Sequence, residues 1–125
     1  MMNDDIFELR MKGYCCSQIL MELGLRKLGK DNPDLVRSMA GLCNGMWRDK
    51  TCGILSAAIC LLYVAEDDDE ISQDLDELYD WFEDSFGSTE CDALIAGNPL
   101  VKTEKCPMML EATLKKVGDL VDWED

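Results

Sequence analysis

Histidine is absent from this chain of 125 residues. Without an imidazole the protein has no His-ligated zinc or haem, no Ser-His-Asp or Cys-His hydrolase site, and no general base of the usual kind for neutral pH. The seven cysteines contain no C-x-x-C pair, the spacing typical of zinc ribbons, thioredoxin-like sites and ferredoxin cluster loops. What remains is cysteine chemistry built from residues far apart in the sequence.

Long apolar segments and an export signal are also missing. The longest apolar run, residues 54–65, is shorter than the ~20 residues that a membrane span needs. The first residues are acidic, whereas a secretory signal begins with basic ones. We therefore expect a cytoplasmic protein with no membrane contact. In that reducing compartment, clustered cysteines more often serve metal or redox chemistry than structural disulfides.

Positive charge is scarce. Twelve basic residues face 26 acidic ones, which gives a net charge of −14, and residues 51–101 contain thirteen acidic residues and no lysine or arginine. Nucleic acids and anionic membranes both require positive charge on their partner, so neither is expected. A basic protein partner stays open, although a solvated acidic face is the simpler interpretation.

The apolar residues recur with helical spacing, and neither strand-like alternation nor a hairpin turn signal is present. We predict an all-α fold, a single compact domain over residues 1–125 with about six to seven helices. Helices are expected near residues 5–12, 14–28, 33–44, 52–65, 72–86 and 91–97, and from 107 to the C-terminal end. Residues 45–50 and 66–70 are expected to be loops. The segment 52–65 is apolar on every side and should be the central helix.

Helix starts are predicted from capping residues. Asn32 followed by Pro33 marks one start, because proline at the first helical position loses no hydrogen bond. Thr51 is the expected N-cap of the central helix. By the same reasoning as for Pro33, Cys106 becomes the N-cap of a last helix that begins at Pro107.

Three cysteines, Cys52, Cys91 and Cys106, fall at predicted helix N-termini. Unpaired N–H groups and the helix dipole favour the thiolate there, which is the reactive and metal-ligating form. Cys60 lies ~12 Å along the same helix from Cys52, too far to share a metal ion. Cys60 and Cys15 are expected to be buried core residues. Cys43 is the reserve candidate for the site.

Several segments together resemble a known family: the run Gly13–Gln18 (GYCCSQ), the run Thr51–Ser56 (TCGILS), and the single cysteines Cys91 and Cys106. They are similar to the redox-active protein family named for its C-GCAxxG-C-C motif. The resemblance implies a helical domain with a redox role, tied to electron transfer or an iron–sulfur cluster. It selects Cys16 over Cys15, and it implies a site formed by Cys16, Cys52, Cys91 and Cys106.

Three positions depart from that motif. Thr51 replaces its first glycine, Gly53 its alanine and Ser56 its last glycine, and all three replacements are small. Thr51 and Gly53 would flank the site. Trp47 precedes Cys52 by five residues and either covers the site or serves as a core or interface aromatic.

Three functions follow from the sequence. The first is electron transfer through a thiolate-bound metal or iron–sulfur cluster held by Cys16, Cys52, Cys91 and Cys106. The second is a thiol–disulfide switch or oxidoreductase that uses pairs of the same cysteines without a metal. The third is an acidic helical interaction module with inert, buried cysteines. A redox partner protein and a homodimer both stay open, and enzymatic activity is undecided.

Overall fold

The structure is a computed structural model that describes residues 2–66, 68–95 and 99–123. Across these residues the regular structure is helical, and two β-like residues form only an isolated bridge, so the predicted all-α fold is confirmed. The order is α1 (Met2–Met11), α2 (Cys16–Lys27), α3 (Pro33–Ser38), a 3-10 helix η1 (Met39–Leu42), a left-handed turn η2 (Gly45–Asp49), α4 (Gly53–Ala65), α5 (Asp68–Phe86), α6 (Cys91–Ile95) and α7 (Pro99–Val121).

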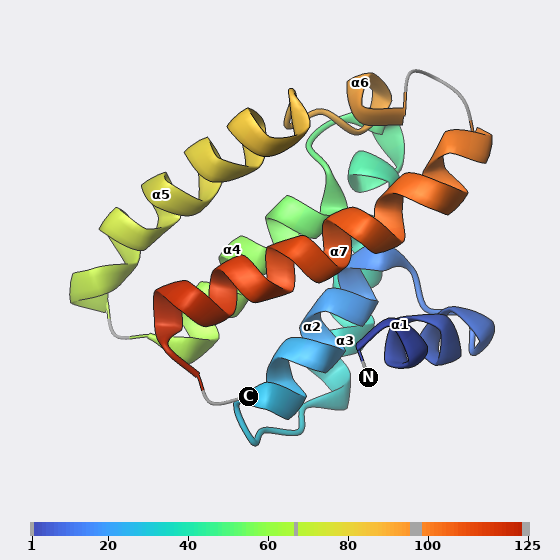
Figure 1. Cartoon of the computed structure of the whole chain (residues 1–125). Coiled ribbons are helices and arrows are strands. Elements are labelled where there is room, and N and C mark those ends of the chain that lie inside the picture. Colours follow the sequence, from blue (N-terminus) through green and yellow to red (C-terminus); the bar gives the residue numbers. More distant parts are fainter. Residues whose placement is uncertain (1, 67, 96–98, 124–125) are drawn as a thin grey trace.

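Helix α4 is the centre of the fold, as its uniformly apolar sequence predicts. Seven of its thirteen residues are buried, and it packs against α2, α5, α7 and η1. Figure 1 shows α7 crossing in front of α4, with α5 on one side and α2 on the other. The N-terminal end of α4, which carries Cys52, is therefore enclosed by the rest of the chain.

Helices α2 and α4 approach each other closely because small residues lie at their interface. A Cβ atom added to Gly24 would overlap the Leu61 side chain. Further along, a Cβ on Gly53 would lie 2.5 Å from the Leu42 carbonyl oxygen and 3.4 Å from the Ser17 Cβ. Side chains larger than glycine at these two positions would push the helices apart. This close approach sets the start of α2 beside the start of α4.

The connection from α3 to α4 contains an unusual left-handed segment. Asn32 caps α3 as predicted, since its Oδ1 accepts the Leu35 N–H at 3.1 Å. After η1 the chain turns through positive φ at Asn44 and at Gly45, Met46 and Trp47, with values from 53° to 61°. Non-glycine residues rarely adopt this conformation. The residues predicted as a loop thus form an ordered turn between Cys43 and Lys50.

Helix α5 begins at Asp68, four residues earlier than predicted, and the expected acidic loop at 66–70 is wrong from that point on. The acidic run therefore does not delay the start of the helix. Leu78 and Phe82 are fully buried. The Phe82 and Phe86 rings lie edge to face with centroids 4.8 Å apart.

Helix α7 differs most from the prediction. It begins at Pro99 and continues through Pro107, whereas the sequence predicted a helix that starts at Pro107. The rule that proline favours the first helical position was sound, but it applied to Pro99. Cys106 therefore lies inside a helix and is not an N-cap.

No helix in the described part of the chain is both long and apolar enough to cross a membrane.

Candidate functional site

Two of the four predicted site cysteines are held together by backbone pairing. The Cys52 N–H donates to the Thr89 carbonyl at 2.7 Å, and the Cys91 N–H donates to the Lys50 carbonyl at 2.6 Å. These bonds flank an antiparallel bridge between Thr51 and Glu90. Residues in such a diagonal relation lie ~7–8 Å apart. The pairing thus fixes the N-terminal ends of α4 and α6 side by side.

Cys52 is the N-cap of α4, yet it is not a thiolate. Its side chain is 5 % exposed, and this burial raises the pKa of the Cys52 thiol to about 11. The N–H groups of Ile54 and Leu55 act in the opposite direction but do not outweigh the loss of hydration. The expectation that a helix start makes Cys52 a thiolate is therefore wrong, because burial dominates.

Cys91 and Cys16 add to the raised pKa of Cys52 by electrostatic repulsion. Like charges affect each other in this way only at short range. Three of the four predicted cysteines thus lie within one electrostatic neighbourhood. Cys91 is buried and is the first residue of α6, as the capping pattern predicted.

Cys16 occupies a different kind of position from Cys52 and Cys91. It is the first residue of α2 and is half-buried. It lines a solvent-accessible cavity of about 120 Å³ together with Arg10, Tyr14, Cys15, Cys43 and Asn44.

Cys106 is buried within α7 at 5 % exposure. An interior helical residue has no free N–H groups near its side chain, so the thiolate argument made for a Cys106 N-cap is wrong. The neighbouring Lys105 ammonium donates to the Leu94 carbonyl at 2.8 Å, which ties this turn of α7 to α6. Whether Cys106 acts with the other three cysteines stays a prediction.

A disulfide joins Cys15 and Cys43, with their Cα atoms 6.2 Å apart and a separation of 28 positions in sequence. Cys15 was expected to be an inert core residue, and this is wrong. The error comes from the helix boundary: α2 begins at Cys16, so Cys15 is its N-cap and turns away from the helix face. One signal was available, because Gln18 stands at the third helical position and its Oε1 accepts the Cys15 N–H at 3.1 Å.

Cys43, the reserve candidate, is the other half of this pair. It is 2 % exposed and lies at the end of η1. No sequence pattern links two cysteines 28 residues apart, so only the packing of α2 against η1 brings them together. The five remaining cysteines, Cys16, Cys52, Cys60, Cys91 and Cys106, are thiols.

A buried hydroxyl group lies next to both sulfur atoms of the disulfide. Ser17 is fully buried, and its hydroxyl donates to the Met39 carbonyl at 2.7 Å. The same oxygen lies 3.0 Å from the Cys43 sulfur and 3.4 Å from the Cys15 sulfur. Sequence reasoning missed Ser17, which looks like an ordinary residue of the first helical turn. It is the one buried hydroxyl within reach of both sulfurs in the described residues.

The three predicted flanking residues have separate roles. Thr51 forms the backbone bridge and does not cap α4, so the expected cap is wrong. Gly53 packs against the Leu42 carbonyl and has no room for the alanine of the motif. Trp47 is 61 % exposed, and its indole N–H donates to the Ala40 carbonyl at 2.8 Å. An exposed indole is not a core aromatic.

The four predicted cysteines are not grouped as the ligands of one metal ion. Among the side chains that the structure describes, no three cysteines, aspartates or glutamates are grouped closely enough to hold one ion. A thiolate-bound metal needs sulfur atoms within ~2.3 Å of a common centre. The arrangement therefore does not fit a metal without movement of the thiols.

Comparison with known proteins agrees with the cysteine pattern. The sequence model of one family, described as "Putative redox-active protein (C_GCAxxG_C_C)", matches residues 14–120 and so includes all seven cysteines. No curated protein and no solved structure gives a significant match. The chain is a cysteine-rich, all-helical protein that belongs to this redox-active C_GCAxxG_C_C family.

Proposed function

We propose that the protein is a thiol–disulfide redox protein whose working pair is Cys15 and Cys43. One observation carries the proposal: these cysteines form a disulfide at the edge of an open cavity. The metal-free alternative in the sequence analysis placed such pairs among Cys16, Cys52, Cys91 and Cys106. The proposal moves the exchange to the pair that lines this cavity.

The two sulfurs have unequal access, which assigns their roles. Cys15 is half-buried and caps α2, a helix of twelve residues, whereas Cys43 is almost fully buried. The N-terminal end of α2 and the Arg10 side chain, which lines the same cavity, both attract negative charge. Cys15 is therefore the attacking thiolate, and Cys43 is the resolving thiol.

The reaction is an exchange of two electrons. The Cys15 thiolate attacks a substrate disulfide, forms a mixed disulfide and expels one substrate thiolate. The Cys43 thiol then gives its proton to water, and the resulting thiolate attacks the Cys15 sulfur, which closes the Cys15–Cys43 bond and releases the second substrate thiolate. Both released thiolates take protons from water. The substrate is reduced to a dithiol, and the pair is oxidised.

Ser17 assists whichever step leaves charge on Cys43. Its hydroxyl can turn from the Met39 carbonyl to the Cys43 sulfur, 3.0 Å away, and donate a charge-assisted hydrogen bond. This stabilises the Cys43 thiolate as a leaving group when the disulfide is reduced. A Ser17→Ala variant should therefore slow reduction of the pair.

The test is a thiol count combined with trapping. Alkylation of the denatured, air-oxidised protein should modify five cysteines, and peptide mapping should show Cys15 linked to Cys43. After dithiothreitol treatment all seven should react. Cys43→Ser should trap a mixed disulfide on Cys15 when a model disulfide is added, and Cys15→Ser should abolish exchange.

Cys60→Ser is the matched control, since Cys60 is a half-buried thiol on the far part of α4. It should behave as the wild type. The proposal is wrong if peptide mapping finds Cys15 and Cys43 unlinked, or if Cys15→Ser exchanges as fast as the wild type.

A second candidate is electron transfer through a thiolate-bound metal or iron–sulfur cluster at Cys16, Cys52, Cys91 and Cys106. It is supported by the effect of Cys91 and Cys16 on the pKa of Cys52, which indicates that the three thiols lie near one another. These thiols would have to move closer together. Anaerobic purification should then give a coloured protein with iron, and serine at any of the four should deplete it while Cys60→Ser should not. A colourless, metal-free protein would eliminate this candidate.

A further inference from the structure

A larger cavity of about 410 Å³ lies between α2 and α3, next to the cavity beside Cys15 and Cys43. Tyr14 lines both cavities, so its side chain borders each of them. The volume is within the ~300–1,000 Å³ range of small-molecule sites.

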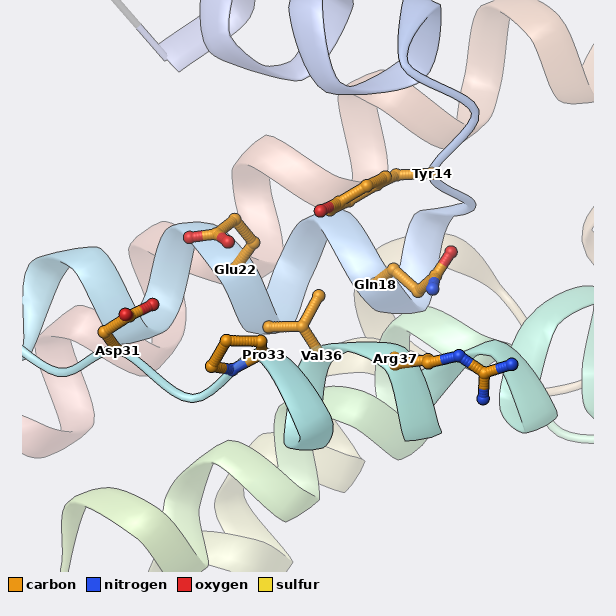
Figure 2. Close-up of a pocket in the computed structure, with 7 residues that line it drawn as sticks. All are labelled: Tyr14, Gln18, Glu22, Asp31, Pro33, Val36 and Arg37. Atoms are coloured by element: carbon orange, nitrogen blue, oxygen red, sulfur yellow. The ribbon is translucent and has the colours of Figure 1, made fainter.

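Opposite charges occupy the two ends of this cavity. Figure 2 shows the carboxylates of Glu22 and Asp31 at one end and the guanidinium of Arg37 toward the other, with Val36 between them. Glu22 already pairs with Arg26 at 3.1 Å. In the described part of the chain, Asp31 and Arg37 have no ion-pair partner. Both side chains are exposed, and a ligand with one ammonium and one carboxylate would pair with both.

The Arg37 end of the cavity is the end nearer the disulfide. Gln18 lies beside Arg37 in Figure 2, and its Oε1 accepts the backbone N–H of Cys15. A ligand whose carboxylate meets Arg37 therefore has its neighbouring atoms at the end of the cavity that lies toward Cys15. A thiol on those atoms would face the side of the cavity that Tyr14 shares with the cavity beside Cys15 and Cys43.

We propose that this cavity binds a short zwitterionic thiol peptide that reduces the Cys15–Cys43 disulfide. The free amino terminus lies at Asp31 and Glu22, and the cysteine residue with its carboxylate lies at Arg37. The proposal names the reducing substrate of the thiol–disulfide function above and rests on it.

Length and charge both suit such a peptide. Gln18 and Glu22 are one helical turn apart, ~6 Å along α2, and an extended peptide spans ~3.5 Å per residue. Two or three residues therefore cover the distance between the charged ends. The chain carries a net charge of −14, which repels anions but not a zwitterion.

The reduction balances with two peptides. The first peptide thiolate attacks the Cys15 sulfur, forms a mixed disulfide and releases the Cys43 thiolate, which takes a proton from water. A second peptide thiolate attacks the peptide sulfur of the mixed disulfide and releases the Cys15 thiolate. The products are one peptide disulfide and the reduced pair.

The experiment compares two probes on the oxidised full-length protein. Gly-Gly-Cys carries both charges, and its N-acetylated, C-amidated form carries neither but has the same thiol framework. The ratio of their rates of Cys15–Cys43 reduction should exceed one in the wild type. Arg37→Gln and Asp31→Asn should each lower the ratio by about three- to tenfold, as expected for loss of one charge-assisted contact.

Lys115→Ala is the matched control, because Lys115 is a 70 % exposed cation on α7 that is not a lining residue of the cavity. It should leave the ratio unchanged. Gly-Gly-Ser, which cannot react, should compete with Gly-Gly-Cys in the wild type only. Equal ratios in the wild type and both cavity variants would overturn the inference and leave the thiol–disulfide function intact. Failure of both probes to reduce the pair would instead contradict that function.

Discussion

Cys15 and Cys43 join α2 to η1 beside an open cavity, whereas Cys52 and Cys91 lie under the paired starts of α4 and α6. Cys15, Cys52 and Cys91 all stand at helix N-termini, so helix ends alone would make these three equally reactive. Burial separates them: it holds Cys52 as a neutral thiol and leaves Cys15 accessible. Under the proposed function, we infer that access to solvent, more than the helix dipole, decides which cysteines react.

The largest effect is expected when the Cys15–Cys43 disulfide is reduced. A cross-link over 28 residues should stabilise the fold by about 3–4 kcal/mol, mainly by restricting the unfolded chain. Urea unfolding of the wild type with and without dithiothreitol measures this difference. Cys15→Ser should match the reduced wild type. If dithiothreitol leaves the urea midpoint unchanged, the Cys15–Cys43 link does not stabilise the fold. The two groups of cysteines would then not differ in this respect.

The next test is alkaline pH. Below pH 9 the Cys52 thiol is protonated in both folded and unfolded chains, so it adds no pH dependence. Above pH 9 the unfolded chain loses this proton first, because folding raises the pKa to about 11. Stability should fall by about 2–3 kcal/mol between pH 9 and 11.

Unfolding free energies of the wild type and Cys52→Ala over this pH range isolate the effect, since other groups titrate in both proteins. The variant should show the shallower decline. Parallel curves would mean that Cys52 is less buried than its contacts indicate.

A smaller effect is expected where the backbone next to Cys52 contacts the backbone next to Cys43. Gly53 follows Cys52 and touches the carbonyl of Leu42, which precedes Cys43. Gly53→Ala should destabilise the fold by about 1–3 kcal/mol, because a backbone oxygen cannot move aside easily. Gly41→Ala is the control, since a Cβ there meets nothing within 4 Å. Equal unfolding midpoints for the two variants would show that the regions are not in close contact.

The smallest effect concerns Trp47. Trp47→Phe removes the hydrogen bond to the Ala40 carbonyl and should cost about 0.5–1 kcal/mol. Rates of thiol alkylation should not change, because the indole is exposed and Trp47 is not a lining residue of the cavity beside Cys15 and Cys43. Faster alkylation of Cys52 in Trp47→Phe would instead support the prediction from sequence that Trp47 covers the site.

Local sequence rules placed most helices correctly. The apolar segment that became α4 and the Asn32–Pro33 start of α3 needed only periodicity and capping chemistry. The same rules failed at Pro107, because a helix of 23 residues can tolerate one missing N–H when its neighbours favour helix. They also failed at Cys15, where a boundary error of two residues changed the direction of the side chain.

The candidate site depended on packing that no local pattern encodes. The Cys15–Cys43 link requires α2 to lie against η1, and the Cys52–Cys91 pairing requires the chain around Thr89 to return to Lys50. The prediction that Cys52 is a thiolate failed for a related reason. Helix-end effects can be inferred from sequence, whereas the depth of burial that outweighs them depends on the whole fold.

The left-handed turn from Asn44 to Trp47 is anchored at one end by Cys43 and at the other by the bridge at Thr51. Reduction of the disulfide releases the first anchor only. The freed segment carries exposed Arg48 and Lys50, the residues after which trypsin-like proteases cut. We therefore expect the reduced protein to be cleaved in this turn sooner than the oxidised one, so that redox state would also set how long the chain survives proteolysis.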